Sequence, residues 1–174
     1  MARNVQAVAG SLRGQHPLIF VTVGTHGQAF SRMLRGVEQL PEQAEIVIQY
    51  GQGEAPSGVR HAAAFMPFGE MEEYFGTADL VVTHAGVGSI LCARRAGHRP
   101  IVVPRYRELG EHVDDHQVEL TRALSELGEV TPVWRNEEIA PAVAASSRRD
   151  RGALPSGGDG ALQRAVRAAL LDAQ

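Results

Sequence analysis

The 174-residue chain is long enough for one domain with a buried core, and 44% of its residues are hydrophobic. Its formal net charge of −3 argues against attraction to nucleic acid or to an anionic membrane surface, so no nucleic-acid partner is predicted. The single cysteine, Cys92, cannot form an internal disulfide, and neither a signal-peptide-like start nor a long apolar stretch is present. These features predict a cytoplasmic protein.

The N-terminal half alternates short apolar runs with helical patterns. Residues 1–17 are polar and contain glycine, so a flexible leader is expected there. The predicted elements that follow are strands at 18–23, 45–50 and 61–65 and helices at 30–40 and 68–78.

The C-terminal half continues the same alternation. Its predicted elements are strands at 79–84, 100–104 and 130–134 and helices at 88–97, 111–128 and 136–146. The composition of 146–160, rich in serine, glycine and arginine, predicts a linker, and 161–174 reads as a last amphipathic helix.

The order of these elements predicts the fold class. Nearly unbroken apolar strands that alternate with helices indicate a parallel sheet covered on both faces. We therefore expect residues 18–145 to form an α/β domain with one Rossmann-like, doubly wound parallel sheet. Ligands of such sheets bind outside the carboxyl ends of the strands, so the loops that follow the strands are the candidate site.

Two glycine-rich loops follow predicted strands, GTHG at 24–27 and HAGVGS at 84–89. Glycine lets the backbone come within hydrogen-bonding distance of a ligand, and the start of a helix favours a phosphate. Thr25 and Ser89 add hydroxyl donors. The alternative is that the glycines only make tight turns, although two such loops together favour a diphosphate. Neither loop fits the Walker A or dinucleotide-binding pattern, which argues against ATP and NAD.

Residues 105–117 place many polar side chains after a predicted buried strand. They would suit the hydroxyls of a sugar, but a solvated helix start is an alternative. A metal site is a third reading, because His112 and His116 are spaced i, i+4. Zinc hydrolases with that spacing carry Glu after the first His, where this chain has Val113, and no third ligand is evident. No metal is therefore predicted.

Five segments in order resemble the C-terminal domain of glycosyltransferase family 28. They are VTVGTH (21–26), QYGQG (49–53), ADLVVTHAGVGSI (78–90), AGHRPIVVPR (96–105) and GEHVDDHQ (110–117). The resemblance is strongest to small cytosolic subunits of two-part UDP-sugar transferases. These include the PssE-type subunits of bacterial exopolysaccharide glucuronosyltransferases and the catalytic subunit of the eukaryotic dolichol-linked N-acetylglucosaminyltransferase. It implies the C-terminal half of a GT-B enzyme.

The resemblance also implies a role for particular residues. The diphosphate would lie at Gly24, Thr25, His26, Gly86, Val87, Gly88 and Ser89. The uridine would lie at Phe65, Met66 and Phe68, on either side of Pro67. The donor sugar would be contacted by Glu111, Asp115, His116 and Gln117. The catalytic base is expected on a partner chain, with Glu111 and His112 as the candidates within this one.

One position departs from the family pattern. Many relatives carry a ribose-binding glutamate in the helix after HAGxGS, and Cys92 stands in its place. A thiol cannot accept two ribose hydrogen bonds, so ribose recognition is expected to be weaker or to come from elsewhere. The donor sugar is left open, although Arg105 and Arg107 would suit the carboxylate of a hexuronate.

The resemblance implies the donor-binding, catalytic subunit of a two-component inverting glycosyltransferase. It would transfer a sugar from a UDP-sugar to a lipid-linked acceptor in polysaccharide biosynthesis, with no cofactor and no metal. The acceptor half would be a membrane-anchored partner, which would hold this chain at the cytoplasmic face of the membrane. One alternative is a non-catalytic nucleotide-binding or scaffolding subunit. Another is a UDP-sugar epimerase or hydrolase, which the missing second half disfavours.

Overall fold

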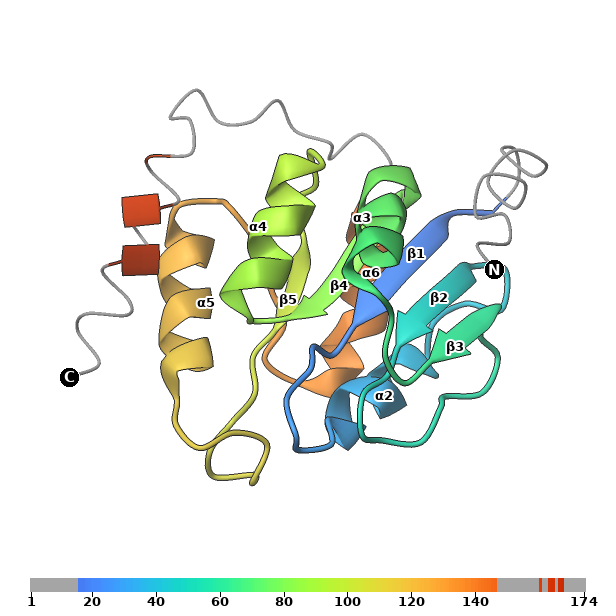
Figure 1. Cartoon of the computed structure of the whole chain (residues 1–174), viewed down its shortest axis with the longest axis horizontal. Helices are drawn as coiled ribbons and strands as arrows, with labels where there is room; N and C mark the ends of the chain where they lie inside the picture. Colours follow the sequence, from blue (N-terminus) through green and yellow to red (C-terminus); the bar gives the residue numbers. More distant parts are fainter. Residues whose placement is uncertain (1–15, 147–159, 161–162, 165, 168–174) are drawn as a thin grey trace.

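The computed structural model describes residues 16–146 and, near the C-terminus, residues 160, 163, 164, 166 and 167 (Figure 1). Nearly all of the predicted leader and linker and most of the predicted helix at 161–174 lie outside the described residues. No helix in the described part of the chain is both long enough and apolar enough to cross a membrane.

The described chain is built on a six-stranded parallel sheet with strand order β3-β2-β1-β4-β5-β6. The strands are β1 (Leu18–Thr22), β2 (Glu45–Gln49), β3 (His61–Ala63), β4 (Leu80–His84), β5 (Ile101–Val103) and β6 (Thr131–Pro132). Each lies within its predicted range, so the predicted doubly wound α/β fold is confirmed. The strand order reverses between β1 and β4, which is where ligands bind in such sheets.

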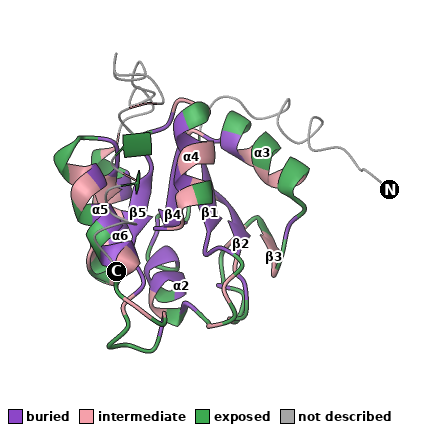
Figure 2. Ribbon diagram, turned by 60° about the vertical axis from the view of Figure 1, so that its left-hand side comes forward, coloured by how far each residue is buried: buried purple, intermediate pink, exposed green. Residues whose placement is uncertain are grey.

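Helices cover both faces of the sheet (Figures 1 and 2). They are α2 (Ser31–Val37), α3 (Phe68–Thr77), α4 (Val87–Arg95), α5 (His116–Glu126), the short 3-10 helix η1 (Asn136–Glu138) and α6 (Ile139–Ala145). α2 and α6 pack on one face, and α3, α4 and α5 pack on the other (Figure 1). The strands are buried between the two layers, which explains their unbroken apolar sequences.

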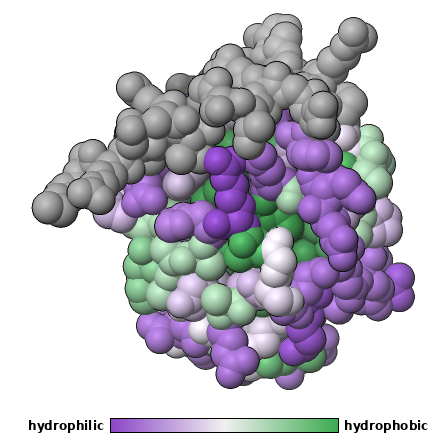
Figure 3. All heavy atoms as spheres, turned by 90° about the vertical axis from the view of Figure 1, so that its right-hand side faces the viewer, coloured by the Kyte–Doolittle hydropathy of each residue, from purple (hydrophilic) through white to green (hydrophobic). Residues whose placement is uncertain are grey.

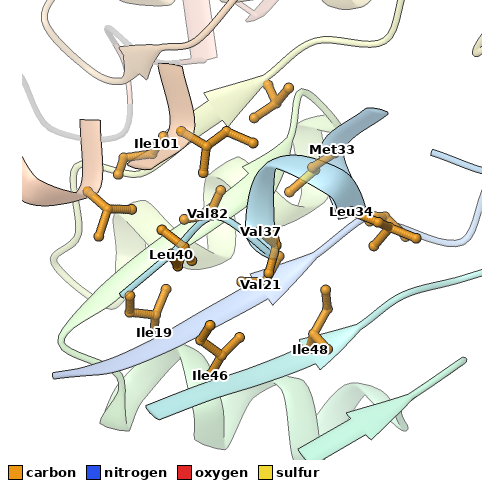
Figure 4. Packing of buried hydrophobic residues seen from close by; sticks show 14 of the residues in the cluster. Ile19, Val21, Met33, Leu34, Val37, Leu40, Ile46, Ile48, Val82 and Ile101 are labelled. Carbon is orange, nitrogen blue, oxygen red and sulfur yellow. The ribbon is translucent and has the colours of Figure 1, made fainter. Parts of the chain in front are cut away.

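Side chains of β1 alternate between the two layers. Ile19 and Val21 point to the α2–α6 side, where aliphatic residues of neighbouring strands and of α2 surround them (Figure 4). Phe20 points the other way, and its ring meets Phe75 of α3 edge-on, with 5.0 Å between ring centroids. The core thus fixes β1 and β4 side by side and places their carboxyl ends together.

The helix predicted at 111–128 is wrong over its first five residues, because α5 begins at His116. Gly110 has a φ of 67°, in the left-handed region, which a right-handed helix does not contain. The chain therefore turns at Gly110. The carboxylates that follow accept from backbone N–H groups of the loop and of the first residue of α5. Asp114 accepts from His116 at 3.1 Å, and Asp115 accepts from Arg107 at 3.1 Å. Residues 104–115 therefore form a loop, called here the β5–α5 segment.

Candidate functional site

The carboxyl ends of β1, β4 and β5 bring three loops to one edge of the sheet, the lower edge in Figure 1. Buried polar side chains lie beneath this edge, near the carboxyl ends of β1, β2 and β4. Thr22 is paired in register with Gln49 and with Thr83, and all three are fully buried. The Thr22 hydroxyl donates to the Gln49 side-chain oxygen and accepts from the N–H of Gly24 at 3.2 Å. Thr22 thereby anchors the start of the first glycine loop.

The two glycine loops close around the ring of His84, the last residue of β4. A methyl group at Gly24 would collide with Nε2 of His84, and one at Gly86 would collide with its Cε1. Gly24 also has a φ of 79°, where other residues are strained. Gly24 is therefore needed for the turn itself, and its contact with a diphosphate stays a prediction. Both glycines are needed because a side chain is packed between the loops, and the sequence alone did not show this.

His84 is held as a neutral imidazole. Burial lowers its pKa to about 3, and the charge of Arg105 and the nearby His112 and His26 act in the same direction. Its Nε2 lies 3.3 Å from the hydroxyl of Ser89, in the first turn of α4. The structure places the His84 ring between the two glycine loops.

Ser89 and the other α4 residues of the predicted diphosphate site lie at the start of a nine-residue helix. Gly86 is the N-cap residue, and within the described chain no side chain caps this end. The unpaired N–H groups and the positive end of the helix dipole are thus left for an anion. Val87 and Gly88 form the first turn together with Ser89, as the predicted diphosphate site requires.

Arg105 joins the first glycine loop to the β5–α5 segment. Its guanidinium is fully buried and donates to the carbonyl oxygens of Val23 at 3.0 Å, Gln28 at 2.9 Å and Glu111 at 3.1 Å. The guanidinium carbon also lies 4.4 Å from the centre of the Phe30 ring. Burial lowers the Arg105 pKa to about 10, so the group remains charged at neutral pH.

These contacts overturn the suggestion that Arg105 reads a hexuronate carboxylate. Its Nη1 and Nη2 atoms donate to backbone carbonyl groups, and the side chain does not reach the solvent. Arg107, in contrast, is exposed. Specificity for a uronate would therefore have to come from Arg107 or from another residue.

Two of the predicted sugar contacts have side chains held inside the protein. Glu111 forms a buried ion pair with Arg32, with 2.9 Å between Nε and Oε1, and its Oε2 accepts from the N–H of Tyr106 at 3.0 Å. The Oε1 of Gln117 accepts from the N–H of Arg105 at 3.1 Å. Both groups thus shape the β5–α5 segment, whatever their contact with a ligand. A role of Glu111 as the base stays a prediction.

Histidine and aspartate side chains of this segment contact one another and the first glycine loop. The ring of His26 stacks on that of His112, with 4.6 Å between centroids and 18° between planes. Asp114 lies between two histidines, 3.0 Å from Nδ1 of His112 and 3.2 Å from Nδ1 of His116. The stack joins the first glycine loop to the β5–α5 segment a second time. No sequence pattern predicts this stack, because the two residues come from distant parts of the chain.

A metal site is not evident among these histidines. Within the described residues no group of three or more histidine, cysteine or acidic side chains is arranged to hold a metal ion. His112 lies outside α5, so the helical i, i+4 geometry that suggested a shared metal is not present. His112 and His116 share the Asp114 carboxylate instead.

The predicted uridine residues lie between β3 and α3. Phe65 is 49% exposed and Phe68, the first residue of α3, is 61% exposed, whereas Met66 is buried against the α3–α4 side of the core. Figure 3 faces the sheet edge formed by β3 and shows hydrophobic surface surrounded by hydrophilic residues. Two exposed aromatic rings at a carboxyl edge offer a stacking surface for a flat base. Cys92 of α4 packs against the same core cluster as Met66.

The sequence that forms this arrangement matches a known protein family. Residues 18–144 match the model of the glycosyltransferase family 28 C-terminal domain. The chain belongs to this family. The expected resemblance is thereby confirmed over the part of the chain that contains all five motifs.

Two curated relatives share part of the sequence. The UDP-N-acetylglucosamine transferase subunit ALG13 of Eremothecium gossypii is 39% identical over 88 residues, which cover 49% of this chain and 41% of that protein. The protein of the same name from Yarrowia lipolytica is 32% identical over 84 residues, covering 44% of this chain and 41% of that protein. The match therefore spans about two-fifths of the length of these relatives.

Solved glycosyltransferases share the fold. The glycotransferase of kitacinnamycin superposes with a TM-score of 0.58 at 22% identity, covering 92% of this chain and 43% of that one. The calicheamicin glycosyltransferase CalG4 gives a TM-score of 0.54 at 19% identity, covering 90% of this chain and 39% of that one. At these identities the likeness shows the fold alone. The whole of this domain corresponds to less than half of each enzyme.

Proposed function

We propose that this protein is the donor-binding, catalytic subunit of a two-component inverting glycosyltransferase that uses a UDP-sugar. The observation that carries the proposal is the pair of glycine loops closed around His84 at the adjacent ends of β1 and β4. This arrangement offers backbone N–H groups and the start of α4 to one ligand, as a diphosphate requires. Family membership supports the same function.

The proposed chemistry depends on where negative charge develops during sugar transfer. An acceptor hydroxyl would attack the anomeric carbon from the face opposite UDP, and the bond to the β-phosphate oxygen would break. Negative charge then grows on the leaving diphosphate, beside the N-terminus of α4 and the Ser89 hydroxyl. Preorganised donors at that place lower the barrier without a metal, so we propose metal-independent transfer. The base would come from the partner chain.

The names of the curated relatives suggest which donor sugar to test. Both are named as UDP-N-acetylglucosamine transferase subunits, which makes UDP-N-acetylglucosamine the first donor to test. Asp115 and His116 are the first candidates to read its hydroxyls, because Asp115 is exposed and His116 half-buried, whereas the Glu111 and Gln117 side chains are buried. UDP-glucuronate is the second donor to test, with Arg107 as its candidate contact.

The proposed partner chain is supported by the curated relatives, because both are named as subunits. We propose that a membrane-anchored chain supplies the acceptor half and binds a lipid-linked sugar. This chain would then work at the cytoplasmic face of the membrane, in the synthesis of a polysaccharide or another lipid-linked glycan.

The test is sugar transfer by the complex, with the full chain and its partner incubated with each UDP-sugar in EDTA. We expect transfer from one UDP-sugar, and we expect Asp115→Ala to lower kcat/KM for that donor. A non-catalytic scaffold is the second candidate, since Cys92 stands where many relatives carry a ribose-binding glutamate. If Asp115→Ala and Ser89→Ala complexes keep full activity, the scaffold is the better account.

A further inference from the structure

A path of polar side chains runs from the β5–α5 segment to the first turn of α4. It starts at the backbone N–H of Arg105, which donates to Oε1 of Gln117 at 3.1 Å. The Nε2 of Gln117 lies 3.5 Å from Nδ1 of His84, and Nε2 of His84 lies 3.3 Å from Oγ of Ser89. Gln117 and His84 are each 9% exposed, so water has little access to the path.

The direction of this path is fixed at its first step. A backbone N–H can only donate, so the Gln117 oxygen faces Arg105 and its NH₂ group faces His84. An NH₂ group also only donates, so Nδ1 of His84 must be the acceptor. The imidazole is neutral and carries one proton, because burial lowers its pKa to about 3. That proton is then on Nε2, where it faces the Ser89 oxygen.

We propose that His84 is a positioning residue that donates from Nε2 to Ser89 Oγ and so turns the Ser89 hydroxyl proton toward the diphosphate. This inference rests on the proposed function, because it takes UDP as the ligand of the glycine loops. It gives the Gln117 side chain a task in diphosphate binding, in addition to any contact with the sugar.

The physical reason is the donor and acceptor balance of a hydroxyl group. In the described part of the chain Ser89 Oγ has His84 as its one hydrogen-bond partner. Once Oγ accepts from His84, its own proton is free for a phosphate oxygen. With the proton on Nδ1 instead, Ser89 would donate to His84 and present a lone pair to the anion. The tautomer of His84 thus decides whether Ser89 attracts or repels the ligand.

A merely structural role is the competing account. The His84 ring also fills the space beside Gly24 and Gly86, so any substitution could disturb both loops. Two variants separate the roles. His84→Gln keeps an amide donor near the position of Nε2, and His84→Asn keeps a partner for Gln117 but withdraws the donor from Ser89.

The first measurement is the tautomer itself, from long-range ¹⁵N–¹H correlation spectra of the full, ¹⁵N-labelled chain at neutral pH without ligand. We expect the proton of His84 on Nε2. Gln117→Glu replaces the NH₂ donor by an acceptor, and we expect it to bring a proton onto Nδ1. A wild-type His84 protonated on Nδ1, or a variant whose Nδ1 stays unprotonated, would overturn the proposal.

The second measurement is a double-mutant cycle on UDP affinity, since UDP has no sugar for Gln117 to contact. A hydrogen bond to a charged group corresponds to about tenfold or more in affinity, so we expect at least this loss for Ser89→Ala. We expect nearly the same loss for His84→Asn, and no further loss when both are combined. His84→Gln should keep most of the affinity. Additive losses in the double variant would mean a structural role and would overturn the proposal.

Failure of the inference can be told from failure of the proposed function. A wild-type chain that binds UDP but shows additive losses would overturn only the role of His84. A wild-type chain that binds no UDP, alone or with its partner, would overturn the proposed function, and with it the diphosphate as the target of Ser89. The tautomer spectra need no ligand and remain a separate test of the path from Gln117 to His84.

Discussion

The two sides of the candidate site bind their surroundings in opposite ways. The glycine loops present backbone, and one side chain, His84, fills the space between them. The β5–α5 segment and the start of α5 present a row of charged and polar side chains, yet Arg105, Glu111 and Gln117 bind the protein itself. A row of polar residues in a sequence therefore overstates the number of groups left for a ligand. On the glycine side an added side chain has no space, whereas in the segment the loss of a partner leaves a buried charge unpaired. Substitutions on the two sides should therefore act through different causes.

The largest effect is expected on the charged side, from Arg32→Ala. This change leaves the buried Glu111 carboxylate without its ion-pair partner and removes the donor to the Trp134 and Pro104 carbonyl groups. Such a loss lowers the free energy of unfolding by about 3–5 kcal/mol. Urea denaturation measures it. The control is Arg135→Ala, which breaks the exposed pair with Glu138 and should change stability little; equal losses would refute the buried network.

On the glycine side, Gly86→Ala should come next. The added methyl group collides with the His84 ring, so we expect about 1–3 kcal/mol lower stability and a loss of UDP affinity of at least tenfold. In Gly88→Ala, two residues on, the methyl group meets nothing within 4 Å. That variant should be as stable as the wild type or slightly more stable, because alanine favours the helix. Similar destabilisation by both variants would contradict the packing of the His84 ring against Gly86.

The neutral state of His84 predicts a dependence of stability on pH. Its folded-state pKa of about 3 lies below the ordinary value of 6.5, so the unfolded chain takes up the proton more readily. The contribution is fully present above about pH 6.5 and falls by about 1.4 kcal/mol per pH unit on acidification toward pH 3. Urea denaturation at pH 7, 6 and 5 should therefore show a steeper loss in the wild type than in His84→Gln. Parallel curves would show that His84 does not titrate in this way.

The smallest effect is expected at Cys92, which lies on α4 away from both sides of this comparison. Its thiol packs against the α3–α4 side of the core, and burial raises its pKa. We expect Cys92→Ala to cost about 1 kcal/mol or less in stability and to leave UDP affinity within about twofold. Calorimetry checks the affinity. A large loss would show that the thiol takes part in binding ribose.

The sequence predicted the sheet and the glycine loops because both leave local signals. An apolar run such as LIFVTV reports burial on two faces, and glycine at a strand end reports a special backbone. The β5–α5 segment was harder, since the pattern at 111–115 resembles a helix start. There Gly110 and the Asp114 and Asp115 carboxylates stabilise turns instead.

Contacts between distant residues could not be predicted at all. The stack of His26 on His112, and the reach of Arg105 back to the Val23 carbonyl, depend on which strands become neighbours. No spacing in the sequence encodes them. Arg105 illustrates the error that results, because from the sequence an arginine near a site is expected to contact the ligand. Its actual partners are the carbonyl oxygens of Val23 and Gln28, on either side of the first glycine loop, and of Glu111.

The central claim is that the two glycine loops hold the diphosphate of UDP without a metal. Calorimetric titration of the full chain with UDP in EDTA, against ADP as control, tests it most directly in a matched pair of variants. Gly24→Ala strains a φ of 79° and collides with His84, whereas a methyl group at Gly27 of the same loop meets nothing within 4 Å. The account predicts saturable binding of UDP over ADP in the wild type and in Gly27→Ala, and its loss in Gly24→Ala. Equal UDP binding by all three, or binding that EDTA abolishes, would contradict it.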